Sequence, residues 1–363
     1  MVAPVTSMES ASGWETVRMT ELRGSRPSRA TTPIPTMRDV ADHLGVSRQL
    51  VSMVLRGVDG PSAESRERIL TAARELGYRP NASARLLKRD RTKLIGVVFQ
   101  IRNPFQGRFV EELLVRASAA GYGLALEPVT DDRTTDTVVA ELMEQRVEAI
   151  IAFNPDQGSS VLREAIDRMP VVLLGEWARL SAVDNVHVDE ERGLLQAVEH
   201  LVTLGHTRIA YVGGIGADLG PQRAEAYRAA MSAFGRRERA VIIPSDFSEE
   251  SGADAARSVL TMSDDRPTAL ICCGDQCATG VLAVFARSRV SVPRDVSVIG
   301  FDDSYLASLS YQQLTSVHQD VGATVEATMG CVLARLSGED APVQRIATST
   351  RLVVRTTTGA PVR

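Results

Sequence analysis

The sequence lacks the features that mark secreted, membrane-spanning or disulfide-stabilised proteins. Its four cysteines are not spaced as a disulfide framework. No apolar run approaches the roughly 18 residues that a transmembrane helix needs. The N-terminus has no basic segment followed by an apolar one, so no secretory signal is expected. These absences predict a cytoplasmic protein.

The sequence also lacks the common signatures of metal sites and of catalysis. Three cysteines crowd into Cys272, Cys273 and Cys277, but no histidine lies near them and no second ligand pair follows. The stretch "GGIGADLG" has the spacing G-x-G-x-x-x-G, which is not that of a dinucleotide-binding loop. A nucleophile elbow and a P-loop are both missing. We therefore expect no metal, no cofactor and no enzymatic activity.

Charge divides the chain into two parts. Up to residue 93 there are 16 Lys and Arg against 10 Asp and Glu, whereas the remaining residues hold 25 against 35. A basic head on an acidic body favours a polyanionic partner for the head alone. Residues 1–35, rich in Ser, Thr, Pro and Arg, have no sustained periodicity and are predicted to be a disordered tail.

From residue 94 onward, short apolar runs alternate with segments of helical length. "LIGVVF", "EAIIAF", "RIAYV", "TALICC" and "VSVIG" are typical of strands that are buried on both faces of a parallel sheet. Seven or more such strands, joined mostly by helices, predict right-handed βαβ units. We expect two doubly wound α/β subdomains that face each other across a cleft.

Residues 37–57, "MRDVADHLGVSRQLVSMVLRG", predict two crossing helices. The first runs from Met37 to Leu44, and Gly45 allows the tight turn that follows. Ser47 is a suitable N-cap for the second. At about 100° per residue the second helix has an apolar arc and an opposite polar arc, the polar arc consisting of Arg48, Gln49, Ser52, Met53 and Arg56.

The polar arc is suited to reading DNA. Arg and Gln near a helix N-terminus have the donors and acceptors for bidentate bonds to guanine and adenine edges in the major groove. A solvated face on an ordinary helical hairpin is the alternative. A third helix over Ala63 to Leu76, capped by Ser62 and ended by Gly77, is predicted to close a small core with Ile69, Leu70, Ala73 and Leu76.

The stretch "RPNASARLLKRD" (79–90) predicts a helix that is too short to be stable alone. Asn81 is a candidate cap, and the residues after it favour helix. Isolated helices below about 12 to 15 residues are marginal in water. Basic residues crowd its end, so an ordinary basic linker is the alternative interpretation.

Taken together, several motifs resemble the LacI/GalR family of bacterial transcription regulators, those similar to the lactose and purine repressors. They are "VADHLGVSRQLVSMVL", "ELGYRPNASARLL", "HLVTLGHTRIAYVGG", "QRAEAY", "VSVIGFDD" and "LTSVHQD", in register from about residue 37 to the C-terminus. The resemblance implies a small all-α helix-turn-helix DNA-binding domain at 36–80, a hinge helix at 81–92, and an α/β periplasmic-binding-protein-like body at 94–363. That body would bind an effector and dimerise.

The resemblance also implies roles for the connector. In similar proteins it is coil when free and becomes helical when two copies pair on the operator and enter the minor groove. Leu87 stands at the position of the wedging leucine, Ala84 lies one turn earlier, and Asn81 and Lys88 complete the predicted contacts. Arg48 and Gln49 occupy the family's main base-reading positions. Met53 departs from the arginine or histidine often found at its position, which leaves the operator preference there open.

For the body, the resemblance implies two lobes with an effector between them. The first lobe is predicted at about 94–204 and 320–336, and the second at about 205–318 and 338–363. The predicted effector contacts are Phe105, Gln106, Glu176, Arg223, Phe247 and Asp275. Asp302 and Asp303 are expected to organise a turn instead.

The function that follows is a homodimeric regulator that binds double-stranded operator DNA under the control of a small-molecule effector. A repressor of a carbohydrate-use operon is the first reading, and a nucleoside- or purine-responsive regulator of the same family is the alternative. A sugar-binding protein of the transport type shares the body's fold, but the DNA-reading segment argues against it. The sequence names neither the effector nor the sign of its effect.

Overall fold

The computed structural model describes residues 35–55, 57–78, 91–175, 177–215, 219–263, 265–338 and 341–362. The chain divides into two units, Met1–Lys88 and Arg89–Arg363. Except for Pro35, the predicted tail lies outside the described residues. Of the predicted hinge at 81–92, only Arg91 and Thr92 are described, and neither is helical.

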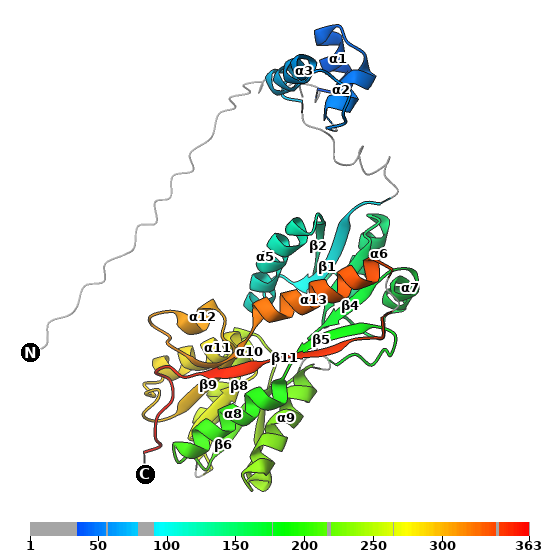
Figure 1. The fold of residues 1–363 in the computed structure, drawn as a ribbon. Coiled ribbons are helices and arrows are strands. Elements are labelled where there is room, and N and C mark those ends of the chain that lie inside the picture. Colours follow the sequence, from blue (N-terminus) through cyan, green and yellow to red (C-terminus); the bar gives the residue numbers. More distant parts are fainter. Residues whose placement is uncertain are drawn as a thin grey trace, which may run out of the picture. The chain divides into compact units, whose positions relative to one another are not determined.

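The first unit has three helices within its described residues (Figure 1): α1 (Met37–Leu44), α2 (Arg48–Leu55) and α3 (Ala63–Glu75). Thr36 and Asp39 form a capping box at the start of α1, which satisfies backbone donors that the helix leaves free. Gly45 turns the chain with a φ of 68°, a conformation that favours glycine. Ser47 Oγ accepts a hydrogen bond from the Leu50 N–H at 3.1 Å, which confirms the predicted cap of α2.

One small apolar core holds the three helices together. It contains one face of each helix: Val40, Ala41, Val51, Val54, Ile69, Ala72 and Ala73. Leu70 was expected in this core, but its side chain is 41% exposed. Ala72 takes the inward position instead, because on a helix the residues three and four apart, here Ile69, Ala72 and Ala73, share a face.

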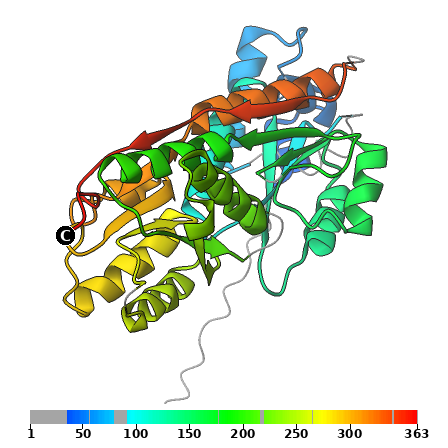
Figure 2. The ribbon, with the colours of Figure 1, turned by 90° about the horizontal axis from the view of Figure 1, so that it is seen from below.

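The second unit contains two six-stranded sheets within the described residues, and Figure 2 shows them side by side. The first sheet has the order β11-β5-β4-β3-β1-β2, and all its strands are parallel. Its strands are β1 (Leu94–Gln100), β2 (Gly123–Val129), β3 (Ala149–Phe153), β4 (Val171–Leu174), β5 (Asp184–Val188) and β11 (Arg345–Thr348). Alternate side chains fill two separate cores, one on each face.

Helices cover both faces of this first sheet. One core contains residues of α5 (Pro104–Ala119) and α13 (Val321–Leu336). The other contains residues of α6 (Thr135–Glu144) and α7 (Ser160–Arg168). The short apolar runs of the sequence therefore correspond to strands that are buried on both sides, as predicted.

The second sheet has the order β12-β10-β9-β8-β6-β7, with β12 antiparallel to β10 and the other neighbours parallel. Its strands are β6 (Ile209–Gly214), β7 (Val241–Ser245), β8 (Ala269–Cys272), β9 (Ser297–Asp302), β10 (Thr315–Gln319) and β12 (Thr350–Val353). Its helices are α8 (Glu190–Thr203), α9 (Leu219–Ala233), α10 (Glu249–Thr261), α11 (Asp275–Arg287) and α12 (Tyr305–Ser308), with one 3-10 turn, η1 (Arg237–Arg239).

The chain passes between the lobes at three points: between β5 and α8, between β10 and α13, and between β11 and β12 (Figure 1). Two of these points correct the predicted lobe boundaries. Helix α8 belongs to the second lobe, because its apolar residues pack in the core of the second sheet. Strand β11 belongs to the first lobe, because it pairs with β5. No helix among the described residues is long and apolar enough to cross a membrane.

Two glycines, Gly252 on α10 and Gly280 on α11, let these two helices of the second lobe approach each other closely. A Cβ added at Gly280 would overlap the Glu249 carbonyl oxygen, and one at Gly252 would overlap the Cys277 carbonyl oxygen. Both overlaps are with backbone, which cannot rotate away as a side chain does. The spacing of the two helices is therefore set by glycine at these positions.

We expect Gly280→Ala to destabilise the second lobe by about 1 to 3 kcal/mol, because overpacked cores must shift backbone to accept the added carbon. Urea unfolding of the full chain measures this loss. Gly330→Ala is the matched control, since Gly330 is exposed on α13 and its Cβ would meet nothing within 4 Å. That control should be neutral or stabilise the helix by up to about 1 kcal/mol. Equal effects of the two substitutions would contradict the close packing.

Candidate functional site

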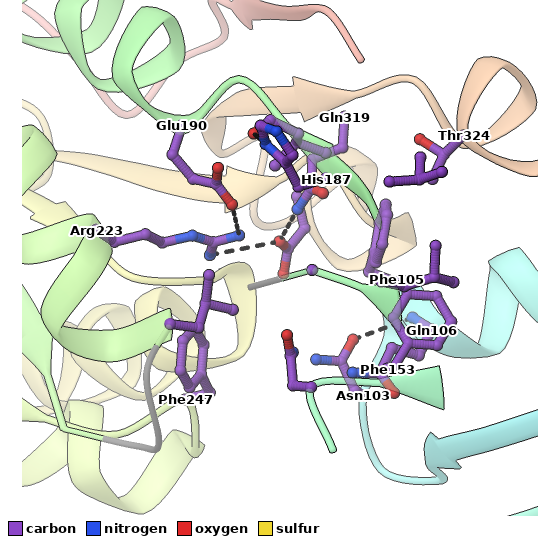
Figure 3. A pocket seen from close by; sticks show the side chains of 17 residues that line it. Asn103, Phe105, Gln106, Phe153, His187, Glu190, Arg223, Phe247, Gln319 and Thr324 are labelled. Carbon is purple, nitrogen blue, oxygen red and sulfur yellow. Dashed lines mark hydrogen bonds and ion pairs between the residues drawn. The ribbon is translucent and has the colours of Figure 1, made fainter. Parts of the chain in front are cut away.

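A cavity with both polar and apolar walls lies between the two lobes, at the ends of strands from both sheets (Figure 3). This position agrees with the rule that open α/β sheets bind ligands beyond the carboxyl ends of their strands. Its described lining includes Asn103, Phe105, Gln106, Phe153, Asn154, Leu174, Gly175, Val186, His187, Val188, Glu190, Leu219, Arg223, Phe247, Asp302, Gln319 and Thr324.

Four of the six predicted effector contacts meet at this cavity: Phe105, Gln106, Arg223 and Phe247. Asp275 does not line it, and Glu176 lies outside the described residues. The structure adds residues that the sequence analysis did not select, chief among them Glu190, His187 and Gln319. The only sequence signal for Glu190 was the acidic run "DEE" at residues 189–191, which is also ordinary for a helix start.

The first lobe contributes the start of α5 and an aromatic wall. Asn103 caps the N-terminus of α5, and its Oδ1 accepts a hydrogen bond from the Gln106 N–H at 3.1 Å. Gln106 is 3% exposed, and its Oε1 accepts from the Gln100 N–H at 2.7 Å. Phe105 and Phe153 meet edge to face at 6.4 Å between ring centroids. These contacts fix the orientation of the amide and of the rings.

The second lobe contributes Arg223, whose side chain is almost completely buried. Its Nη1 donates to the Cys273 carbonyl at 2.6 Å, and its guanidinium lies 3.9 Å from the centroid of the Phe301 ring. Phe247 lies on another side, at 5.7 Å. These contacts hold the guanidinium at the cavity wall.

Two carboxylates flank this guanidinium. Glu190 Oε1 lies 3.9 Å from Arg223 Nη2 (Figure 3). Asp302 Oδ1 lies 3.9 Å from Arg223 Nη1. Both distances exceed a hydrogen bond. Within the described residues, Glu190 Oε1 and Arg223 Nε have no hydrogen-bond partner. Asp302 is held separately, because Gln319 Nε2 donates to its Oδ1 at 2.5 Å.

Burial changes the acidity of both carboxyl groups. It raises the pKa of Glu190 to about 7, although Arg223 opposes the shift. It also raises the pKa of Asp302 to about 6, again against the effect of Arg223. Groups that titrate near neutrality and face a cavity are frequent at functional sites.

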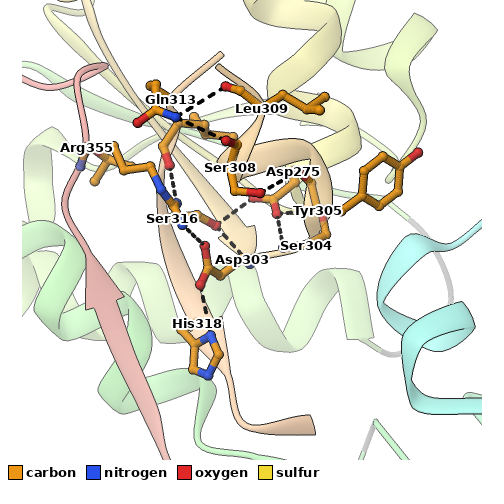
Figure 4. A network of polar contacts seen from close by, with 12 residues as sticks. Asp275, Asp303, Ser304, Tyr305, Ser308, Leu309, Gln313, Ser316, His318 and Arg355 are labelled. Carbon is orange, nitrogen blue, oxygen red and sulfur yellow. Dashed lines mark hydrogen bonds and ion pairs between the residues drawn. The ribbon is translucent and has the colours of Figure 1, made fainter. Parts of the chain in front are cut away.

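Asp275 has a different role from the one predicted. Its Oδ2 accepts from the N–H and the hydroxyl of Ser304 at 2.6 and 2.8 Å, and its Oδ1 accepts from the Ser316 hydroxyl at 2.6 Å (Figure 4). Its side chain is 1% exposed. With these three donors, Asp275 ties the chain after β9 to β10 rather than facing the cavity.

Asp302 and Asp303 are neighbours in the chain at the end of β9, but their side chains have different partners. Asp303 organises the turn, as expected: it pairs with Arg355 Nη2 at 2.6 Å and with His318 Nδ1 at 2.9 Å (Figure 4). Asp302 was expected to do the same, but it lines the cavity. The φ angles of Asp302 and Asp303 are 106° and 49°, values that are rare for residues with a side chain. A strained backbone conformation of this kind is kept only where surrounding contacts stabilise it, and such conformations are frequent at functional sites.

On the first unit, the predicted reading helix presents its polar residues as expected. Arg48 and Gln49 are exposed, whereas Ser52 and Met53 are partly buried. Val51 and Val54 on the opposite side are buried in the core. The predicted DNA contacts Asn81, Ala84, Leu87 and Lys88 lie outside the described residues, as does Arg56.

A helical unit that exposes one polar helix face has the architecture of a sequence-reading DNA-binding domain, and a two-lobed body with a central cavity has that of small-molecule binding proteins. A chain with both belongs to the class of ligand-responsive DNA-binding regulators. Comparison with known proteins identifies the family.

Two family models match the chain: "Bacterial regulatory proteins, lacI family" over residues 36–81 and "Periplasmic binding protein-like domain" over residues 198–358. The HTH-type transcriptional regulator DegA of Bacillus subtilis (strain 168) is 31% identical over 334 residues, covering 89% of this chain and 98% of that protein. The ribose operon repressor of Escherichia coli (strain K12) is 31% identical over 319 residues, covering 86% and 96%.

Among solved structures, the lac repressor dimer bound to operator and the anti-inducer ONPF superposes with a TM-score of 0.77 at 28% identity, covering 90% of this chain and 100% of that one. The chain belongs to the lacI family of bacterial regulatory proteins. It is a DNA-binding transcriptional regulator with an effector-binding body, not an enzyme.

Proposed function

We propose that this regulator is a homodimeric repressor of a carbohydrate-use operon, and that a sugar bound between its lobes controls its affinity for operator DNA. It acts in the cytoplasm, where it meets the DNA. The observation that carries the proposal is the cavity of Arg223, Glu190, Asp302 and Phe247, in a chain whose helix α2 exposes Arg48 and Gln49.

The chemistry of the cavity supports a sugar. Carboxylate oxygens accept from hydroxyl groups, and the amides of Gln106 and Gln319 can both donate and accept. The Phe105 and Phe247 rings supply apolar faces for the C–H side of a sugar ring. The similarity to a ribose operon repressor favours the same class of effector. We assign the direct contacts to Phe105, Gln106, Arg223 and Phe247, together with Glu190 and Asp302.

On the DNA side, Arg48 and Gln49 are proposed to read base edges from the N-terminal half of α2, after its cap at Ser47. Ser52 and Met53 would lie beside the backbone or the bases of the same groove. Asn81, Ala84, Leu87 and Lys88 keep their predicted roles in the minor groove. Two copies are needed, because a two-fold operator presents two half-sites.

Control follows from linkage. A ligand that prefers the lobe arrangement incompatible with operator binding must lower DNA affinity by the coupling free energy, typically about 1 to 3 kcal/mol. We therefore expect the effector to change operator affinity by about 5- to 150-fold. The sign separates an inducer, which lowers the affinity, from a corepressor, which raises it.

The test begins with selection of binding sites from random duplex DNA by the full-length protein, followed by fluorescence anisotropy on the selected site. Free sugars and nucleosides are then screened by thermal shift, and each ligand that binds is added to the anisotropy assay. A two-fold site whose affinity responds to a free sugar supports the proposal. A response to nucleosides alone would replace the sugar with the alternative effector class. Ligand binding that leaves operator affinity unchanged would overturn the sensing role.

A further inference from the structure

The cavity has more buried acids than its cation can neutralise. Among the described lining residues, the permanently or potentially charged groups are Glu190, Asp302, Arg223 and His187. Two carboxylates thus face one guanidinium. The other lining residues, apart from His187, are either uncharged polar residues or apolar residues. A ligand that enters this space meets an excess of hydrogen-bond acceptors.

Arg223 does not satisfy either carboxylate. Both Arg–carboxylate distances are 3.9 Å, and Nη1 donates to the Cys273 carbonyl at 2.6 Å instead. Glu190 Oε1 has no hydrogen-bond partner within the described residues although its side chain is buried. A buried acceptor without a donor is costly, so a ligand that supplies the donor gains affinity from it.

The same arrangement repels anions. An anionic group that approaches Arg223 must also come close to a carboxylate, because Glu190 lies 3.9 Å from Nη2 and Asp302 lies 3.9 Å from Nη1. The face of the guanidinium is covered by the Phe301 ring at 3.9 Å. Like charges at such separations in a buried site oppose each other strongly.

We propose that Glu190 is a specificity-determining residue, which makes the cavity select neutral, hydroxyl-rich ligands and reject their phosphorylated or carboxylated forms. This inference rests on the proposed function, because it concerns the effector of the same cavity. Glu190 accepts a hydroxyl of the ligand, and its charge together with that of Asp302 excludes an anion. We expect a free sugar to bind roughly 100-fold more tightly than its phosphate ester.

Proton linkage provides a second signature. The charged and titratable groups around Glu190 are Arg223 on α9, Asp302 at the end of β9, Asp189 before α8 and His187 on β5. Burial raises the pKa of Glu190 to about 7. A hydroxyl that donates to the carboxylate favours the ionised form, so binding releases a proton. The affinity for a free sugar therefore rises as the pH increases from 6 to 8.

The experiment uses the full-length protein and matched pairs: D-ribose with D-ribose 5-phosphate, and D-glucose with D-glucose 6-phosphate. Isothermal titration calorimetry at pH 6 and pH 8 measures the affinities of the wild type, Glu190→Gln and Glu191→Gln. Glutamine is neutral and close in shape to glutamate, so Glu190→Gln retains the fold. Glu191 is exposed on the same helix and is not in the cavity lining, which makes its substitution the matched control.

In the wild type and in Glu191→Gln at pH 8, where Glu190 is ionised, we expect the free sugar to bind and its phosphate to bind roughly 100-fold more weakly. In Glu190→Gln, the discrimination at pH 8 should fall to about 10-fold, and the pH dependence of sugar binding should become weaker, leaving the part that comes from Asp302. Tighter binding of the phosphate to the wild type would overturn this inference and leave the proposed sensing role intact. Equal narrowing in both variants would remove the role of Glu190. If neither sugar nor phosphate bound to any of the three proteins, the proposed function would fall for these effectors, and the inference with it.

Discussion

Replacing Arg223 with methionine is expected to destabilise the effector-binding body by about 3 to 5 kcal/mol at pH 8. Methionine fills much of the same space, so the loss comes from charge rather than from a cavity. The substitution removes the only cation that lies between Glu190 and Asp302 among the described residues lining the cavity. It also removes the donor to the Cys273 carbonyl. Urea unfolding followed by circular dichroism measures the change.

The loss should depend on pH in a defined direction. Burial raises the pKa values of Glu190 to about 7 and of Asp302 to about 6, so the folded protein binds protons more tightly than the unfolded chain does. Stability contributed by these groups is therefore present at low pH and is lost as the pH rises through the folded pKa values. Without Arg223 both pKa values rise further. The destabilisation is then largest above pH 7 and much smaller at pH 5.

Arg228→Met is the control for this experiment. Arg228 lies on the same helix, and its ion pair with Glu225 is on the surface, with the arginine side chain 43% exposed. Exposed pairs contribute at most about 1 kcal/mol, so this variant should unfold nearly as the wild type does. An Arg223→Met loss that is equal at pH 5 and pH 8 would mean that packing, rather than the two carboxylates, accounts for the role of Arg223.

The architecture was predictable because its signals are local. Short apolar runs predict parallel strands that are buried on both faces. Gly45 marks a helix end through its backbone conformation, and Ser47 and Ser62 mark helix starts because their hydroxyl groups cap the first turn. The lobe boundaries were not predictable in this way. Helix α8 follows a strand of the first sheet but packs on the second. Its amphipathic pattern is the same in either position, so only the tertiary contacts decide.

Some residues of the cavity could likewise be predicted from the sequence, and others could not. Phe105, Gln106, Arg223 and Phe247 line the cavity, and their contact with an effector stays a prediction. Asp302 ends strand β9 and Asp275 follows strand β8, and sequence alone cannot tell which of the two carboxylates faces the cavity. The backbone conformation determines which carboxylate faces the cavity. Asp302 has a φ of 106°, which is rare for a residue with a side chain and could not be expected from an aspartate in the sequence. Asp275 instead points away from the cavity and accepts hydrogen bonds from two hydroxyl groups and one backbone N–H.

Replacing Gln49 with alanine is expected to lower the affinity for the selected operator by about 5- to 150-fold, the equivalent of the roughly 1 to 3 kcal/mol carried by one bidentate base contact. Affinity for unrelated duplex DNA should stay unchanged, because an uncharged side chain contributes little to phosphate attraction. The salt dependence of operator binding should stay unchanged for the same reason. Fluorescence anisotropy on both DNAs over a series of salt concentrations measures all three quantities.

The exposure of Gln49 makes the experiment selective, because its removal leaves the core of the first unit intact. Val51, two residues later, is fully buried in that core. Val51→Ala should therefore lower the binding of operator and of unrelated DNA together, as the unit loses stability. A parallel loss on both DNAs for Gln49→Ala would assign Gln49 to the folding or phosphate-binding part of the helix. Loss on the operator alone requires that α2 lies in the major groove with its N-terminal half against the bases, since a side chain on any other face of the helix cannot distinguish one base pair from another.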